Sequence, residues 1–397
     1  MDAHARGTRP YPPGRGEGVF ALDRRRFLLL AAGAFAGEAL LPLSAWAKRA
    51  EPGIPLQPWS VPKEMPGNPL DTVRALIGAG VLAPSDWNTQ PWRFEVDGTQ
   101  IRLVADPART LPVTDPDRRG MMLSLGAALE NMLVTARAYG LRPVVMYQPN
   151  EGANGVVAEL TWTLGDQHRD RGLFAAVTER RTNRHDYDGR AVFTQNRVQL
   201  SAQVPDGLGL HWLDDRDRIR RVAELTHDAT HAQMDDRRAQ AEQYSWLRLD
   251  GDEKKRGDGV AVDALEFAGP ADWFASRYFN PKSMFLGFGV DSSAKQARSQ
   301  VRSSGALALL TAARRDDTTR IMAGQTFERF ALKATGLGIA HHPLSAPVEV
   351  EKTRGPLLAE FGATGEDPLL LIRLGHAKPP KPSPRRAVSL VATYRNT

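Results

Sequence analysis

The chain has 397 residues, of which 42% are apolar and 25% charged, enough for one large domain or two ordinary ones with a real core. It contains no cysteine, which excludes disulfides, thiolate metal sites and cysteine nucleophiles. The net charge of +6 is a mild excess without a basic stripe of interleaved aromatic residues, so we expect no nucleic-acid partner.

The first 47 residues have the pattern of an export signal. The segment Asp23-Arg-Arg-Arg-Phe-Leu-Leu29 closely resembles a twin-arginine motif, and Ala45-Trp-Ala47 is a small-x-small cleavage site. Glu38 and Pro42 interrupt the apolar stretch, so we expect no stable membrane span after cleavage. We expect a signal peptide over 1–47, a periplasmic or otherwise exported protein, and the twin-arginine export machinery as a partner. The alternative is a frayed helix of the mature protein.

The elements expected next follow from apolar periodicity and turn signals. Residues 48–68 are rich in proline and should form an extended linker. The expected elements are then a helix from about Leu70 to Pro84 capped by Asn68, hairpin strands over 92–96 and 101–105 around Asp97-Gly98, an amphipathic helix over 117–139 ending at Gly140, and strands over 144–148 and 156–164.

The second part of the chain is less regular. Residues 214–300 have a polar helical pattern with several aromatic residues, and Arg256-Gly-Asp258 is expected to be a loop. The other expected elements are a helix leading to 180, a buried strand over 306–311, helices over 317–335 and 347–358, a final strand over 369–374, and an extended tail over 379–386.

One internal repeat is visible between 126–141 and 324–339. The two segments align without gaps, and the apolar positions match at helical spacing. Any two amphipathic helices share this spacing, but identical residues also coincide at Gly126/Gly324, Glu130/Glu328, Ala136/Ala334 and Gly140/Gly338. The repeat therefore predicts an internal duplication.

Two short segments carry the functional signal. They are Leu82-Ala-Pro-Ser-Asp-Trp-Asn-Thr-Gln-Pro-Trp-Arg-Phe94 and Glu179-Arg-Arg-Thr-Asn-Arg184. Both resemble the signature segments of the FMN-dependent nitroreductase family, and the chain is most similar to the fused Acg-type branch. In an ordinary member the arginine segment comes first and two chains build two sites. Here the order is reversed and each segment occurs once, so the resemblance implies a single-chain pseudo-dimer with one site.

The resemblance extends over about 70–390 and is weak over 200–300. It implies an α+β class, namely a nitroreductase-like three-layer fold with a central, mostly antiparallel sheet. The expected fused halves are 69–170 and 171–397, with a segment that covers the flavin at 240–290.

Arginine chemistry fits the phosphate end of FMN. A dianionic phosphate needs cations and N–H donors in a fixed fork, which guanidinium groups supply. The resemblance assigns the phosphate, the ribityl chain and the pyrimidine edge to Arg180, Arg181, Thr182 and Arg184. A solvated basic loop is the alternative.

The loop segment is expected to reach the flavin from the other half. Pro84, Ser85, Asp86 and Asn88 match the family's positions, and a hydroxyl and a carboxamide suit the polar edge of the flavin ring. Asp86 stands where serine is common, and a carboxylate there would oppose electron gain. The alternative is a helix stop followed by a strand start.

A third segment and the C-terminus complete the expected site. Pro343, Leu344, Ser345 and Ala346 match the segment that passes over the flavin, and Arg385 and Arg386 match a basic pair at the phosphate. The cation expected beside the pyrimidine carbonyl could be Lys295, Arg298 or Arg302. We expect no metal site. His341-His342 has no third ligand at suitable spacing, and the pair His227 and His231 lacks the glutamate of the zinc hydrolase motif and fits a polar helix face.

The resemblance implies an exported FMN-binding oxidoreductase. Hydride would pass through FMN from a small-molecule electron donor to a nitroaromatic or quinone-like acceptor, with no catalytic side chain. We expect a monomeric pseudo-dimer. The alternative is a non-enzymatic FMN-binding or storage protein with a lid over the flavin.

Overall fold

The computed structural model describes residues 59–148, 155–165, 169–249, 251–261 and 288–395. The expected signal peptide, most of the expected linker and the part of the expected lid over 262–287 lie outside these residues. Within the described residues, none of the helices combines the length and the apolar character needed to cross a membrane.

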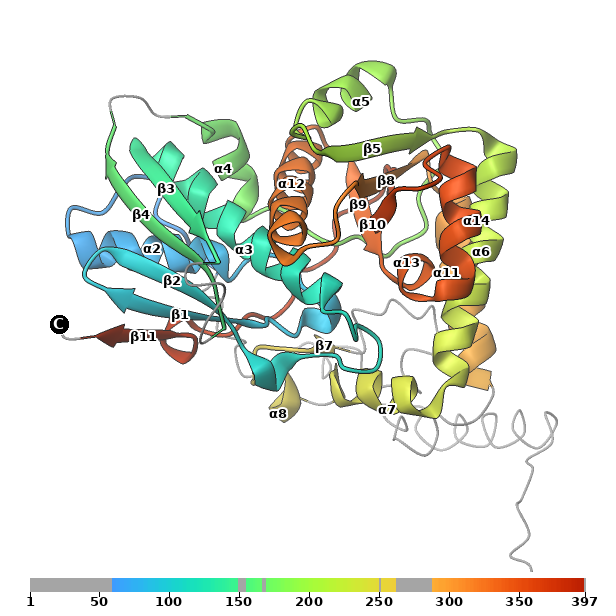
Figure 1. Cartoon of the computed structure of the whole chain (residues 1–397), viewed down its shortest axis with the longest axis horizontal. Helices are drawn as coiled ribbons and strands as arrows, with labels where there is room; N and C mark the ends of the chain where they lie inside the picture. Colours follow the sequence, from blue (N-terminus) through green and yellow to red (C-terminus); the bar gives the residue numbers. More distant parts are fainter. Residues whose placement is uncertain (1–58, 149–154, 166–168, 250, 262–287, 396–397) are drawn as a thin grey trace, which may run out of the picture. The chain divides into compact units, whose positions relative to one another are not determined.

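The first half builds a sheet with one covered face. Its strands lie in the order β11-β1-β2-β4-β3, and the side chains of β1 alternate between the core and solvent. Helices α2 and α3 pack on the inner face (Figure 1). The elements are α2 (Pro69–Gly80), η3 (Asp86–Asn88), β1 (Trp92–Asp97), β2 (Gln100–Ala105), η4 (Pro107–Arg109), α3 (Arg119–Ala138), β3 (Leu141–Tyr147), β4 (Val156–Leu164) and α4 (Arg171–Val177).

Local sequence signals set these elements. The Asn68 side chain caps α2 by accepting a hydrogen bond from the Leu70 N–H at 2.8 Å. Gly98 has a φ of 57°, as a tight hairpin turn requires. The predicted helix and hairpin are present. The long helix expected to be amphipathic is also present as α3, but it is buried on all sides, with Arg137 alone among its residues not buried.

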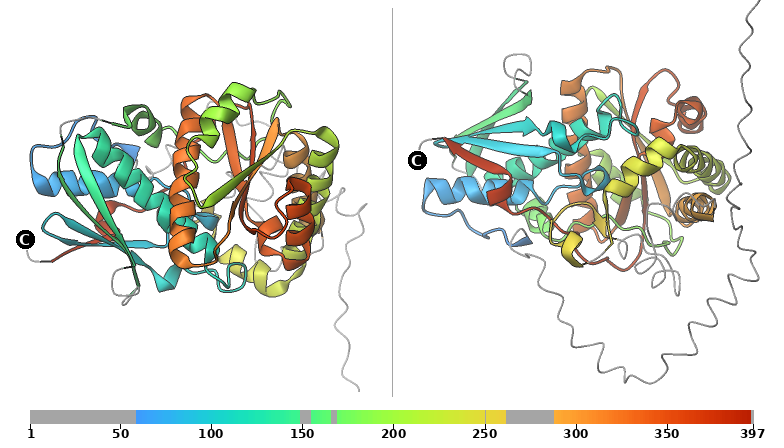
Figure 2. Two further views of the ribbon diagram at one scale, coloured as in Figure 1. Left: turned by 45° about the horizontal axis from the view of Figure 1, so that its top comes forward. Right: turned by 90° about the horizontal axis from the view of Figure 1, so that it is seen from below.

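The second half has three layers. Its sheet has the order β5-β8-β10-β9, with α12 on one face and α6 and α14 on the other (Figures 1 and 2). Strand β8 is buried on both faces, which explains its continuous apolar run. The elements are α5 (Thr194–Ser201), β5 (Leu208–Leu213), α6 (Arg216–Asp235), α7 (Arg237–Ser245), β6 (Leu247–Arg248), α8 (Gly251–Lys254), β7 (Val260–Ala261), α11 (Phe288–Arg302), β8 (Ala306–Ala312), α12 (Asp317–Gly336), β9 (Ala340–Leu344), α13 (Ala346–Glu349), α14 (Glu351–Phe361), β10 (Asp367–Gly375), η7 (Val388–Leu390) and β11 (Ala392–Arg395).

The two halves share one strand order. β1-β2-β4-β3 corresponds to β5-β8-β10-β9, and every pair within these two sets is antiparallel. A core helix follows the second strand of each set, and Gly140 and Gly338 end these helices with φ of 80° and 69°. The α+β class and the arrangement in two fused halves are confirmed.

The core helices α3 and α12 meet at the repeated glycines. A Cβ atom on Gly126 would overlap the carbonyl oxygen of Ile321, and one on Gly324 would overlap that of Leu123. The contact is reciprocal, and it places the two helices side by side between the sheets (Figure 2). Glycine is therefore required at both positions for the halves to join.

Several expectations about elements were wrong. The strand β10 is not the last one, because the C-terminal β11 pairs in parallel with β1 in the first sheet. The helix expected over 347–358 is two helices, α13 and α14. Both α5 and β5 were missed.

Candidate cofactor site

One cavity collects much of the predicted site. It holds about 410 Å³ of space free of atoms, its open mouth included. The loop after α2, the arginine segment, the β7 segment and the C-terminal arm all line it. The lining residues are Pro84, Ser85, Asn88, Thr182, Arg184, Gly259, Val260, Ala261, Ser383, Pro384 and Arg385.

The loop after α2 is held in an uncommon backbone conformation. Trp87, Asn88 and Gln90 have φ values of 50°, 52° and 52°, in the left-handed region that favours glycine. The Ser85 hydroxyl accepts a hydrogen bond from the Gln90 N–H at 3.0 Å and closes the loop. Such strain persists only where the surroundings fix it, as here beside the cavity.

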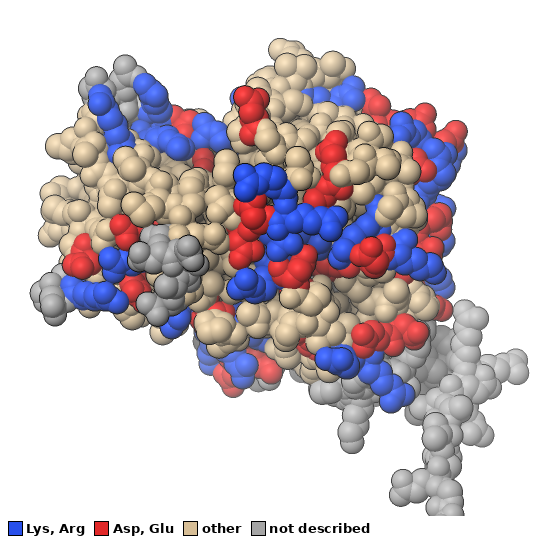
Figure 3. Space-filling view, in the orientation of Figure 1, with Lys and Arg blue, Asp and Glu red and all other residues tan. Residues whose placement is uncertain are grey.

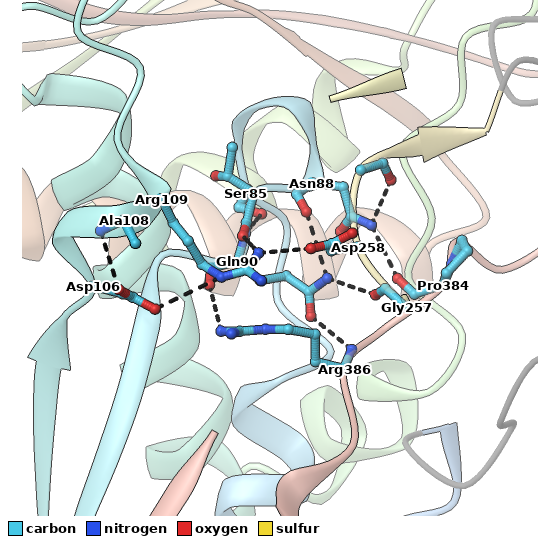
Figure 4. Close-up of polar contacts among 12 residues, drawn as sticks. Ser85, Asn88, Gln90, Asp106, Ala108, Arg109, Gly257, Asp258, Pro384 and Arg386 are labelled. Atoms are coloured by element: carbon cyan, nitrogen blue, oxygen red, sulfur yellow. Dashed lines mark hydrogen bonds and ion pairs between the residues drawn. The ribbon is translucent and has the colours of Figure 1, made fainter. Parts of the chain in front are cut away.

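Asn88 joins three segments of the cavity wall. Its Nδ2 donates to the carbonyl oxygens of Gly259 at 2.8 Å and Pro384 at 3.0 Å (Figure 4). Its Oδ1 accepts from Arg385 Nη1 at 3.0 Å. The amide was expected to face the flavin ring edge. Both of its N–H donors are instead used within the protein, so it holds the wall together.

Buried arginines converge behind the cavity. Arg180 and Arg385 are 2% and 4% exposed, and each donates through Nη2 to the carbonyl oxygen of Leu82, at 3.2 and 3.1 Å. The guanidinium of Arg181 lies 4.1 Å from the ring centre of Trp59, and that of Arg385 lies 5.2 Å from it. Trp59 thus covers the arginine cluster from the N-terminal side.

This arginine cluster, Arg180, Arg181 and Arg385, carries excess positive charge. Burial and the neighbouring Arg180 lower the pKa of Arg385 to about 9 and that of Arg181 to about 10. Glu328 forms an ion pair with the cluster, its Oε1 lying 3.2 Å from Arg180 Nε, and the Glu179 carboxylate acts on Arg181. Burial raises the pKa of Glu328 to about 7, although Arg180 opposes the shift.

The donor set fits a phosphate. Among the described residues, Arg180 Nη1 and Arg385 Nε are buried without a hydrogen-bond partner. Buried donors of this kind cost free energy unless a ligand or water satisfies them. A dianionic phosphate would satisfy the open N–H groups and offset the charge of the cluster.

Asp86 does not line the cavity. It lies in an acidic cluster formed by Asp86, Asp115 and Glu349 around Arg119, in which Asp115 is buried and the other two side chains are half-buried. The Asp115 carboxylate accepts from the N–H groups of Gly120 and Met121 at the start of α3. Burial, followed by the neighbouring carboxylates, raises the pKa of Asp115 to about 7 and that of Glu349 to about 8. Asp86 therefore does not lie in the cavity wall, where its carboxylate would oppose reduction of a flavin.

The segment after α12 lies beside the arginine segment. The Asn183 N–H donates to the His341 carbonyl oxygen at 3.0 Å. Leu344 packs into the core, and Pro343, Ser345 and Ala346 lie in β9 or at the start of α13 rather than in the cavity wall. Burial and Arg180 lower the pKa of His341 to about 3, so this imidazole is neutral at pH 7. No group of metal-ligating side chains occurs among the described residues.

Three other cations lie apart from the cluster. Arg386 Nη2 donates to the carbonyl oxygens of Gln90 and Trp92 and fixes the C-terminal arm. Arg298 and Arg302 both bind Glu224 on the outer helical layer, where basic and acidic side chains lie interspersed (Figure 3). Arg298 and Arg302 are thus not brought to the cavity.

One wall of the cavity comes from within the segment 240–290, which was expected to cover the flavin. The segment 257–261 was expected to be part of a loop or lid, and it is held by buried ion pairs. Asp258 binds Arg248 Nη2 at 2.7 Å. Asp258 also binds Arg109 Nη1 at 2.9 Å, and the Gly257 carbonyl oxygen accepts from Gln90 Nε2 at 2.8 Å (Figure 4). The sequence signal for a fixed backbone in this segment is the pair Gly257 and Gly259, whose φ values are 72° and 70°.

Comparison with known proteins gives relatives over most of the chain. Rv3131 of Mycobacterium tuberculosis, which carries the name of an NAD(P)H nitroreductase, is 30% identical over 334 residues, covering 82% of this chain and 92% of the relative. Acg of the same organism, named likewise, is 24% identical over 82% of this chain and 96% of the relative. No family model matches the chain.

Solved structures give similarities at lower sequence identity. The FMN-dependent nitroreductase NfnB of Mycobacterium smegmatis, in complex with NADPH, is 17% identical, covers 53% of this chain and 94% of its own, and has a TM-score of 0.33. A nitroreductase with bound FMN from Desulfitobacterium hafniense is 12% identical, covers 53% of this chain and 92% of its own, and has a TM-score of 0.30. On the relatives in sequence, the chain belongs to the nitroreductase family of oxidoreductases.

Proposed function

We propose that this chain binds one FMN in the cavity and acts as an oxidoreductase. The observation that carries the proposal is the buried arginine cluster behind the cavity, which Glu328 only partly offsets. A phosphate monoester suits such a cluster because it is dianionic and accepts several charge-assisted hydrogen bonds.

The residues that line the cavity, together with the neighbouring Arg180 and Arg181, would bind and orient the cofactor. Arg180, Arg181 and Arg385 would hold the phosphate, while Thr182 and Arg184 would contact the ribityl chain and the pyrimidine edge. FMN, when bound, would supply hydride transfer between an electron donor and a nitroaromatic or quinone-like acceptor. No protein side chain is needed as a nucleophile or base. The chain orients the flavin and keeps a cation at its ring edge.

Export and the origin of the two halves are further parts of the proposal. The twin-arginine pattern supports export to the periplasm through the twin-arginine machinery and a mature chain that begins near residue 48. The shared strand order supports an internal duplication and a monomer that acts as a pseudo-dimer. Outside the cytoplasm free nicotinamide donors are scarce, so a quinol or a redox partner is the proposed donor.

The second candidate is an FMN-storage protein. The observation that favours it is the wall segment 257–261, which buried ion pairs fix against the cavity. A fixed wall would hide the flavin from a donor as large as a nicotinamide dinucleotide.

The experiment is anaerobic reduction of the FMN-loaded protein, followed by its visible absorbance. Bleaching by NADPH or by a quinol, and return of the colour on addition of a nitroaromatic or a quinone, would support an oxidoreductase and identify its donor. Bleaching by dithionite alone, with no return on addition of either acceptor, would support storage. Failure to retain any FMN would overturn the proposed site.

A further inference from the structure

Glu328 is a buried carboxyl group directly behind the proposed phosphate position. It lies in the middle of α12 with no exposed surface, and its Oε1 is 3.2 Å from Arg180 Nε. The charged and polar groups that face it come from three other elements: Arg180 from the arginine segment, Arg385 from the C-terminal arm, and Asn131 and Glu130 from α3.

Glu328 and a bound phosphate would compete for the same two arginines. Arg180 and Arg385 already share the Leu82 carbonyl oxygen, so their guanidinium groups are fixed close together. A dianion placed on them would add negative charge within a few ångströms of the Glu328 carboxylate. Like charges in a buried region repel strongly, and protonation of the weaker acid relieves the repulsion.

We propose that Glu328 is the counter-ion of the arginine cluster and takes up a proton when the phosphate of FMN enters, a role that rests on the FMN site proposed above. Before binding, the carboxylate offsets part of the cluster's charge and keeps the arginines in place. After binding, the phosphate takes over this role and Glu328 is held as a neutral carboxyl group. FMN affinity is therefore linked to pH through a residue that does not touch the cofactor.

The linkage has a definite sign and range. In the cofactor-free protein the pKa of Glu328 is already about 7, so above pH 7 the group is largely ionised and must gain a proton on binding. Affinity then falls as the pH rises, by up to about tenfold for each pH unit when one proton is taken up. The second ionisation of a phosphate monoester lies near pH 6, so the charge of FMN itself changes little above pH 7.

The repeat offers a matched control. Glu130 occupies the equivalent position in α3 and is also buried, but its partners are Arg137 and Arg329, which Asp170 binds as well. Glu130→Gln thus removes a buried carboxylate from the same core and leaves the Glu328–Arg180 ion pair in place. It also removes a charge that raises the pKa of Glu328, so the loss of affinity should begin at a slightly lower pH.

The experiment is titration of the full mature chain with FMN between pH 6.5 and 8.5 for the wild type, Glu328→Gln and Glu130→Gln. We expect the wild type and Glu130→Gln to lose affinity above pH 7, and Glu328→Gln to bind with little pH dependence and about tenfold more tightly than the wild type at pH 8.5. Equal slopes in the wild type and Glu328→Gln would overturn the proposal.

A second measurement uses the wild type alone, so it tests the proposal even if the Glu328→Gln variant fails to fold. Calorimetric titration of the wild type with FMN at pH 8, in two buffers of different ionisation enthalpy, counts the protons taken up. We expect close to one proton per FMN, and no uptake would overturn the role of Glu328. A wild type that binds no FMN at any pH would instead defeat the proposed cofactor site, so the two failures are distinguishable.

Discussion

At the scale of single residues, substitution of Arg184 tests directly whether FMN binds in the cavity. Arg184 lines the cavity, whereas Arg298 binds Glu224 at 3.2 Å on the outer helical layer. A charge-assisted hydrogen bond is worth about 1.5–3 kcal/mol, so we predict that Arg184→Ala weakens FMN binding by several-fold to about a hundredfold. The dissociation constant from fluorescence titration measures this.

Arg298→Ala is the matched control for that prediction. It removes a guanidinium outside the cavity and should leave the FMN affinity within about twofold of the wild type, because surface ion pairs contribute little. If both substitutions weakened binding equally, the effect would come from net charge, and the cavity would not be the site.

The acidic cluster makes stability depend on pH. Carboxyl groups in an unfolded chain ionise near pH 4, whereas the pKa is about 7 for Asp115 and about 8 for Glu349 in the folded protein. The raised pKa means that their stabilising contribution is complete below about pH 4 and is lost as the pH rises to about 8. We predict that Glu349→Gln, which cannot ionise, gains melting temperature relative to the wild type between pH 5 and pH 8.

The control for the acidic cluster lies two residues away. Glu351 pairs with Arg354 at the surface and its side chain is 86% exposed. Glu351→Gln should therefore show no such gain between the same two pH values. A gain of equal size in both variants would contradict a specific role of the acidic cluster, and thermal melts at matched ionic strength decide between these outcomes.

The residues that line the cavity were predictable from the sequence where they belong to a recognisable motif. Six predicted residues do line one cavity, because both motifs bring their own polar groups: Pro84, Ser85, Asn88, Thr182, Arg184 and Arg385. The direction of the Asp86 side chain and the use of the Asn88 amide were not predictable. The Asp86 carboxyl lies near Arg119 at the start of α3, and the Asn88 amide binds the Gly259 carbonyl oxygen, 171 residues further along the chain.

At the scale of elements, the joint between α3 and α12 depends on two glycines. A methyl group at Gly126 or Gly324 would overlap the backbone of the opposite helix. Overpacking of this kind costs about 1–3 kcal/mol, so we predict that Gly126→Ala and Gly324→Ala each lower the free energy of unfolding by about that amount. Urea denaturation measures the loss.

Gly336→Ala in the same helix α12 is the control for this joint. Nothing lies within 4 Å of a Cβ atom placed there. Because alanine favours helix over glycine, this change should leave stability unchanged or raise it by up to about 1 kcal/mol. A loss of stability at Gly336 comparable to that at Gly126 would mean that helix propensity, not the joint, is being measured.

The wall segment 257–261 can be tested in the same manner. A methyl group on Gly257, whose φ is 72°, would overlap the carbonyl oxygen of Arg385. We predict that Gly257→Ala displaces Arg385 and raises the FMN dissociation rate several-fold. Gly189 has a φ of 75° and open space around it, so Gly189→Ala carries the same backbone strain, about 1–2 kcal/mol, without the contact. Equal dissociation rates in the two variants would contradict the contact.

Elements were predictable where the pattern was local. The hairpin around Gly98 and the long helices α3 and α12 were found because a turn signal or a long apolar period marks them. β5 was missed because its side chains are mostly half-buried and give no clear alternation. β11 was missed because it pairs with β1, nearly three hundred residues earlier in the chain.

At the scale of the whole molecule, the two halves are similar in topology but differ where the site is built. The loop between α2 and β1 runs over 81–91 and supplies the cavity residues Pro84, Ser85 and Asn88. The equivalent connection in the second half, between α5 and β5, runs only over 202–207 and carries no such motif. In place of a second arginine cluster, Glu130 is held by Arg329 and Arg137. These differences between the halves predict one FMN site in each chain.

The number of FMN molecules per chain tests this most directly. The mature chain, residues 48–397, would be purified, saturated with FMN and freed of excess cofactor. The flavin would then be released and quantified against protein concentration, with the molar mass of the complex measured by light scattering. One FMN per monomeric chain is the predicted result. None would contradict the cofactor site, and two would contradict a pseudo-dimer with a single functional half.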